Sequence, residues 1–231
     1  NDVLIAFKHR ILGCIEHTLN GEIAYQKSLK RFRGGLFPFY VGSIAQSEIK
    51  GFEANLIGHS IIDALRGIVL SGKGVNQELS GLKHIAIFGY GHIGRSIACC
   101  LRDHPNMPEV LLSKQTILSI CDIDDERLSE ASENHLYVNA SKEKEKILQE
   151  ADLIILATSG IVLTKADFSM LKSGVYIACA TSSDNLFAEG ALEDFEKDSL
   201  ASLKALTVYK SKYNDKTFLL ANNGRSVNFI I

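Results

Sequence analysis

The chain has 231 residues, enough for one large domain or one and a half small ones, and its 46% hydrophobic content can fill a core. Its formal net charge of −2 gives no support for binding to nucleic acid or to an anionic membrane. No apolar run reaches the ~18 residues of a membrane span, and no signal peptide is visible. We therefore expect a cytoplasmic protein whose partners include neither nucleic acid nor membrane.

The cysteine pattern favours reduced, buried thiols over a disulfide framework. The five cysteines are odd in number and mostly lie within apolar strand or helix patterns (Cys14, Cys99, Cys100, Cys121, Cys179). No spacing of cysteine and histidine indicates zinc, so we expect no metal site. Because the chain begins at Asn1 and ends in a stretch that we predict to be an apolar strand, 227–231, we also expect it to be a fragment of a longer protein.

The first third of the chain is expected to hold strands within residues 3–16, a helix over 21–33 and an extended piece at 39–44. Apolar residues at helical spacing predict a long helix over 47–70, which ends at the glycines of 71–74. We interpret residues 1–72 as an N-terminal segment with this long helix, and residues 73–231 as a second domain.

From Leu82 onward the pattern alternates between strand and helix. We expect strands at 84–88, 116–121, 152–157, 174–180 and 205–209, and helices at 92–102, 125–133, 141–150, 164–171 and 189–198. Near-continuous apolar strands such as 153–157 are typical of a parallel sheet covered on both faces. The predicted class is therefore α/β, a doubly wound parallel sheet of the Rossmann type with an N-terminal extension.

The strand at 84–88 runs into a G-x-G-x-x-G motif, Gly89-Tyr90-Gly91-His92-Ile93-Gly94, and then into a helix. In a dinucleotide site Gly89 permits the tight turn, Gly91 lets a pyrophosphate approach the backbone, and Gly94 lets helix and strand pack closely. The free N–H groups of the helix start face the phosphates, so at His92 the backbone matters more than the ring. The alternative is a strand–helix turn that merely needs glycine.

Two further features lie at predicted strand ends. Asp122 follows the next strand and can accept both ribose hydroxyls, which favours NAD over NADP. The number of residues between the glycines and Asp122 is larger than usual, which fits a surface insertion that contains Pro105 and Pro108. Asp124 or Asp125 is available as the cap of the following helix. Thr158-Ser159-Gly160 follows a later strand, where it would contact the cofactor or form a plain turn.

Several segments, in order, resemble S-adenosylhomocysteine hydrolase. Residues 13–21 (GCIEHTLNG) are similar to the family's G-V-V-E-E-T-T-T-G, and Lys50, Asn55, Leu56 and Gly58 keep its K-x-x-x-x-N-L-x-G spacing. The stretch 89–94 resembles G-Y-G-D-V-G, and 219–228 resembles L-L-A-E-G-R-L-V-N. The resemblance implies tightly held NAD that oxidises the 3′-hydroxyl of a nucleoside, and a homo-oligomer whose subunits close each other's cofactor sites.

The resemblance also implies site residues, and it weakens where the chemistry would be. Lys50 aligns with the catalytic lysine, Thr18 and Asn228 with positions near the nicotinamide, and Thr181 lies in the stretch that replaces N-I-G-H-F-D-N. His17 stands in place of a glutamate and is a candidate general base.

Other departures are Ala54, where the family has aspartate, and Ser182, where it has a substrate-contacting histidine. These departures leave two hypotheses: an enzyme that oxidises a secondary alcohol of a nucleoside- or sugar-like substrate, or a non-catalytic NAD-binding sensor. A D-2-hydroxyacid dehydrogenase ranks last, because no suitable Arg, Glu and His follow the later strands.

Overall fold

The computed structural model describes residues 12–31, 40–72, 82–103, 116–134, 137–140, 143–181 and 186–229. Contacts divide the chain into two units, Asn1–Glu53 and Ala54–Ile231. The division falls inside the long helix α3 (Glu48–Gly72), which is the helix predicted over 47–70. The predicted domain boundary between residues 72 and 73 stays a prediction.

The first unit contains a β-α-β segment. Strand β1 (Gly13–Glu16) pairs in parallel with β2 (Tyr40–Ser43), and α2 (Leu19–Arg31) connects them. A helical crossover is what a parallel pair of strands requires. The predicted helix and extended piece are thus confirmed, whereas the expected strand residues before residue 12 lie outside the described residues.

The second unit is built on one twisted sheet with the order β5-β4-β3-β6-β7-β10-β9-β8. The first six strands of this order, β5-β4-β3-β6-β7-β10, are parallel to their neighbours, whereas β9 and β8 are added at the edge as antiparallel strands. The strand order reverses between β3 and β6, which is the switch point of a doubly wound sheet. The predicted α/β class is confirmed. The strands are β3 (His84–Phe88), β4 (Ile117–Asp122), β5 (Tyr137–Ala140), β6 (Leu153–Leu156), β7 (Val175–Cys179), β8 (Phe195–Leu203), β9 (Leu206–Ser211) and β10 (Thr217–Ala221).

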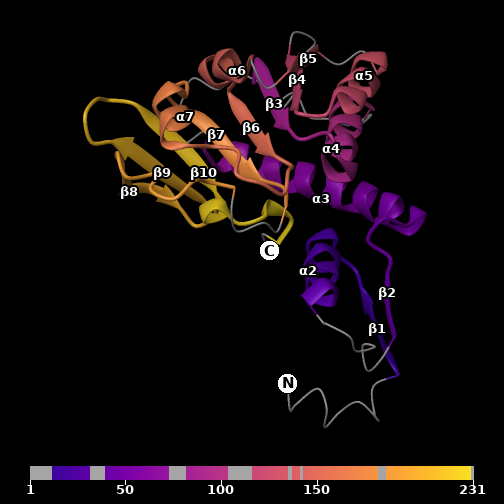
Figure 1. Cartoon of the computed structure of the whole chain (residues 1–231). Coiled ribbons are helices and arrows are strands. Elements are labelled where there is room, and N and C mark those ends of the chain that lie inside the picture. Colours follow the sequence, from indigo (N-terminus) through magenta and orange to yellow (C-terminus); the bar gives the residue numbers. More distant parts are fainter. Residues whose placement is uncertain are drawn as a thin grey trace. The chain divides into compact units, whose positions relative to one another are not determined.

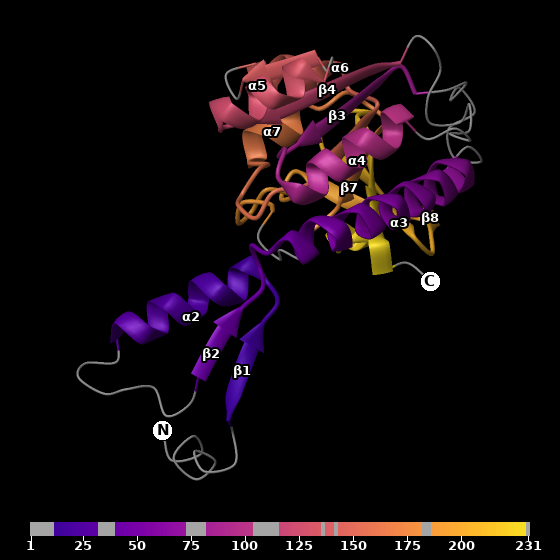
Figure 2. The same cartoon turned by 90° about the vertical axis from the view of Figure 1, so that its right-hand side faces the viewer.

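Helices cover both faces of this sheet, and the side chains of each strand alternate between the two. Ile85 and Ile87 of β3 face the layer of α3, α4 (His92–Asp103) and α5 (Asp125–Glu133). Ala86 and Phe88 face the layer of α6 (Lys144–Glu150) and α7 (Lys165–Met170). Figure 1 shows α6 and α7 over one face, and Figure 2 shows α3 and α4 over the other. Burial on both faces explains why these strands read as continuous apolar runs.

The C-terminal part differs from the expectation. A helix was predicted over 189–198, but residues 189–194 form turns and Phe195 begins β8. The prediction was wrong because β8 is an edge strand, whose exposed charges remove the alternation by which a strand is recognised. Strands β5 and β10 were also missed, and β9 runs antiparallel to β10 (Figure 1). Of the strand predicted over 227–231, the described residues instead form the short 3₁₀ helix η3 (Val227–Phe229), which follows the left-handed turn at residues 222–224.

Local signals fixed the helix starts correctly. The Asp124 side chain accepts the N–H groups of Glu126 and Arg127 and caps α5. Thr164 and Asp167 form the capping box of α7, at the start of the helix predicted over 164–171. Among the described helices, none has both the length and the apolar composition needed to cross a membrane.

Candidate functional site

The glycine loop connects β3 to α4 at the carboxyl edge of the sheet, beside the switch point. Gly89 has φ +98°, and a Cβ there would lie 2.7 Å from the Ala157 carbonyl oxygen. A Cβ at Gly94 would lie 1.9 Å from the Gly89 carbonyl oxygen. The first glycine is therefore needed for the turn and the third for the close approach of helix and strand, as the motif predicts.

Gly91 differs from these two because the space next to it is open. The nearest atom to a Cβ at Gly91 would be the Arg127 Nη1, at 3.9 Å. Helix α4 starts at His92, and its first N–H groups have no partner within the helix. An open backbone beside a helix N-terminus fits the pyrophosphate of a dinucleotide, so the residues present suit this cofactor.

Asp122 ends β4 next to the loop, and its carboxylate is already engaged there. The Tyr90 N–H donates to Oδ2 at 2.5 Å, and the Asp124 N–H donates to Oδ1 at 3.0 Å. The Asp122 side chain is only 4% exposed. Each carboxylate oxygen can accept more than one hydrogen bond, so capacity for ribose hydroxyls remains. The same group thus holds the loop and stands where a cofactor ribose is expected.

Arg127 adds a cation that sequence reasoning missed. Its guanidinium lies 3.7 Å from Asp122 Oδ2 and 3.4 Å from Asp124 Oδ2, and it is half exposed. Arg127 sits in the first turn of α5, which directs its side chain back toward the glycine loop near Gly91. No sequence motif marks this residue; only the fold of β4 into α5 brings it to the site.

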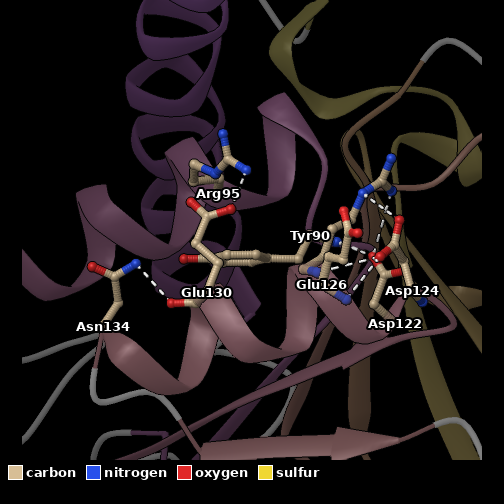
Figure 3. Close-up of polar contacts among 8 residues, drawn as sticks. Tyr90, Arg95, Asp122, Asp124, Glu126, Glu130 and Asn134 are labelled. Atoms are coloured by element: carbon tan, nitrogen blue, oxygen red, sulfur yellow. Dashed lines mark hydrogen bonds and ion pairs between the residues drawn. The ribbon is translucent and has the colours of Figure 1, made fainter.

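Tyr90, the second residue of the motif, anchors the loop from the other side. Its fully buried side chain packs between α4 and α5, and the Arg95 guanidinium lies 5.8 Å from the ring centroid. Arg95 in turn pairs with Glu130 of α5. In Figure 3 the Tyr90 side chain extends toward Arg95 and Glu130, away from Asp122. Burial raises the pKa of Tyr90, so this phenol serves packing and is not a candidate acid.

Further predicted residues gather at the carboxyl ends of β6 and β7. Thr158 follows β6, and its carbonyl accepts the Thr181 hydroxyl at 2.9 Å, which ties the two strand ends together. Ser159 and Gly160 are exposed next to Thr158. Residue Ser226 bridges to Cys179 at the end of β7, and the half-buried Asn228 follows two residues later. The structure therefore brings the later cofactor candidates to the same edge as the glycine loop.

The remaining candidates belong to the first unit. The Thr18 hydroxyl accepts the Gly21 N–H at 3.0 Å and donates to Glu16, so Thr18 caps α2. His17 is exposed. Lys50 pairs with Glu53 at 2.5 Å, while Ala54, at the family's aspartate position, is buried. Their predicted roles toward cofactor or substrate stay predictions.

The five cysteines are free in the structure: Cys100, Cys121 and Cys179 are buried, Cys99 is half-buried and Cys14 is exposed. Burial raises the pKa of Cys179 to about 12 and that of Cys121 to about 11. Burial therefore disfavours a nucleophilic thiolate at Cys179 at neutral pH. Ser182 and the insertion with Pro105 and Pro108 lie outside the described residues.

Comparison with known proteins supports a dinucleotide-binding site at this edge of the sheet. Residues 84–182 match the family described as "NADP oxidoreductase coenzyme F420-dependent". No curated protein matches the chain.

Among solved structures, a dipicolinate synthase polypeptide from Bacillus halodurans is 13% identical over 78% of this chain and 55% of that chain, with a TM-score of 0.50. Its counterpart in the dipicolinate synthase of Bacillus subtilis gives the same identity and TM-score, and 53% of that chain is covered. L-tryptophan dehydrogenase from Nostoc punctiforme is 16% identical over 78% of this chain and 64% of that chain, with a TM-score of 0.46.

Two conclusions follow from these matches. The chain spans about half the length of the dipicolinate synthase polypeptides that it matches, and this likeness shows the fold alone. The family match and the loop geometry together identify an NAD(P)-binding, oxidoreductase-like Rossmann domain. They do not single out S-adenosylhomocysteine hydrolase.

Proposed function

We propose that the chain holds NAD at the carboxyl edge of the sheet and oxidises a secondary alcohol of a nucleoside- or sugar-like substrate. The observation that carries this proposal is the open backbone at Gly91, beside the start of α4 and the Asp122 carboxylate. The α4 N-terminus and the loop N–H groups would hold the pyrophosphate, and Asp122 would accept ribose hydroxyls. When bound, NAD supplies a hydride acceptor.

The charge beside Asp122 supports NAD over NADP. One guanidinium, from Arg127, faces two carboxylates, from Asp122 and Asp124, so this cluster is net negative. A 2′-phosphate would meet that charge, whereas a 2′-hydroxyl can donate to the carboxylate. The matching family carries NADP in its description, which makes this comparison the first test.

The test is calorimetric titration of the chain with NAD and with NADP at the same ionic strength. We expect NAD to bind tighter. Arg127→Ala should widen this preference, because it removes the only cation that the described residues place within 4 Å of Asp122. The matched control is Arg102→Ala, since Arg102 lies at the other end of α4 and its guanidinium donates to the Asn134 carbonyl. Tighter binding of NADP would refute the assignment.

The substrate class rests on the resemblance to S-adenosylhomocysteine hydrolase. Lys50 would hold or move a proton at the substrate sugar, and Glu53 would supply the carboxylate that Ala54 lacks, since the Lys50 ammonium already contacts it. The assay adds adenosine to the NAD-loaded chain and records the absorbance of reduced nicotinamide. Growth of that signal supports oxidation, and its loss in Lys50→Met assigns the lysine. Glu53→Gln should reduce the rate, whereas Glu48→Gln on the same helix should not.

A non-catalytic NAD-binding module is the second candidate function. It is favoured by the buried Ala54 and the exposed His17, which stand where the family has carboxylates. On this hypothesis NAD binds, but neither adenosine nor another nucleoside produces reduced cofactor. A homo-oligomer is proposed for either function, and light scattering at micromolar concentration tests it, because a monomer would contradict it.

A further inference from the structure

The chain after β10 makes a tight return toward the end of β7. Asn222 and Asn223 adopt left-handed conformations with φ of 47° and 53°, and Gly224 has φ 80°. Two side-chain hydrogen bonds help to hold this turn: the Thr207 hydroxyl donates to Asn223 Oδ1 at 2.7 Å, and Asn222 Nδ2 donates to the Ser226 carbonyl at 2.9 Å. Left-handed residues other than glycine are costly and persist where the surroundings fix them, often at functional sites.

This turn places Ser226 in a buried position at the carboxyl end of β7. Ser226 is 5% exposed and forms a parallel bridge with Cys179, the last residue of that strand. Its hydroxyl donates a hydrogen bond to Oδ1 of Asn228. The amide oxygen of Asn228 is thereby engaged, while Nδ2 makes no hydrogen bond to the part of the chain that the structure describes. A pinned oxygen leaves the amide nitrogen as a donor of fixed direction.

The position of Asn228 relates it to one half of the cofactor. The adenosine half of a dinucleotide lies on the side of Asp122 and β4, and its pyrophosphate lies at the start of α4. The other half therefore extends across the switch point, toward the ends of β6 and β7. Asn228 lies at that edge, next to the strand ends that Thr158 and Thr181 tie together.

We propose that Ser226 is a positioning residue that turns the Asn228 amide so that Nδ2 donates to the carboxamide oxygen of the nicotinamide. This inference rests on the proposed function. It goes beyond the resemblance, because the family sequence carries leucine where this chain has Ser226. A leucine at this position has no hydrogen-bond donor that could orient the Asn228 amide, whereas the serine hydroxyl provides one.

The test compares the binding of NAD with that of ADP-ribose, which lacks the nicotinamide. Ser226→Ala should weaken the binding of NAD by about fivefold, the equivalent of one net hydrogen bond, and leave the binding of ADP-ribose unchanged. Ser226→Thr keeps the hydroxyl and should retain the affinity for NAD. The matched control is Ser211→Ala, which removes a different buried hydroxyl at the end of β9. That hydroxyl accepts the Tyr213 N–H, and its removal should change the binding of neither ligand.

A double-mutant cycle decides whether Ser226 acts through Asn228. If it does, Ser226→Ala has no further effect on NAD once Asn228→Ala is present. An effect that persists in that background, or an equal loss for NAD and ADP-ribose, overturns the inference while leaving the dinucleotide site in place. A wild-type chain that binds neither ligand overturns the proposed function itself, and this inference with it.

Discussion

Substitution by alanine should have different effects at two glycines of the same loop, lowering stability at Gly94 and cofactor affinity at Gly91. At Gly94 the new Cβ would lie 1.9 Å from the Gly89 carbonyl oxygen, which is backbone and cannot move aside cheaply. Overpacking of this kind costs up to about 3 kcal/mol. The gain in helix propensity from glycine to alanine, about 1 kcal/mol, offsets part of it. Gly94→Ala should therefore lower stability by about 2 kcal/mol.

At Gly91 the same methyl group meets nothing closer than the Arg127 Nη1 at 3.9 Å. Gly91→Ala should leave stability within about 0.5 kcal/mol of the wild type, as for a substitution without a steric conflict. It should instead occupy the space of the pyrophosphate. The loss of a hydrogen bond to a charged group is about 1.5–3 kcal/mol, which corresponds to about 10- to 150-fold weaker binding of NAD.

The assay pairs thermal unfolding without cofactor with calorimetric titration of NAD. Gly94→Ala should lower Tm by about 4–8 °C, at about 2–4 °C per kcal/mol for a domain of this size. Gly91→Ala should keep the wild-type Tm and lose affinity. An NAD affinity of Gly91→Ala within about twofold of the wild type would mean that no phosphate approaches this backbone, and the reasoning about the loop would fall.

Three other outcomes follow from the same structure. Phe168 is fully buried against the rings of Phe187 and Phe218. Phe168→Ala should therefore lower the free energy of unfolding by about 3–5 kcal/mol, as measured by denaturant unfolding. Burial disfavours the charged form of Asp152, but an ion pair with Lys172 and two backbone N–H donors outweigh the burial and lower the pKa of this carboxyl below 3.8. The carboxylate therefore stabilises the fold above pH 3.8, and this stabilisation is lost as the pH falls through the lowered pKa. Asp152→Asn should therefore destabilise the chain at pH 7, and in thermal unfolding this difference should shrink as the pH falls below 3.8; a constant difference would contradict the linkage. Cys179 should resist alkylation at pH 8 in the folded chain and react only after denaturation, since its pKa is raised to about 12.

The part of the fold that could be predicted is the part encoded by local signals. The turn at Gly89, the cap at Asp124 and the helix start at Thr164 each depend on residues a few positions apart, and each lies where it was expected. The buried strands β3 and β6 were also predicted, because helices cover both of their faces and, apart from His84, their residues are apolar.

Features that have no signature in the local sequence were not predictable. Strand β8 is specified by its register with β9, where Phe195 lies opposite Ser211, and its exposed charges resembled a helix surface. Within the site, Arg127 reaches Asp122 only because α5 starts directly after β4. The bond from Ser226 to Asn228 depends on a left-handed turn that no propensity indicates.

The two hydrogen bonds that Asp122 accepts have a consequence for how this site can evolve. A change of cofactor from NAD to NADP commonly involves the acid at the end of this strand. Here Oδ2 of that acid also holds the Tyr90 N–H, so a substitution that admits a 2′-phosphate would release the second residue of the glycine loop. Tyr90 would then keep only its packing between α4 and α5. On the proposed preference for NAD, a lineage that changed its coenzyme would first have to acquire a new acceptor for that N–H, so the cofactor preference and the structure of the loop would have to change together.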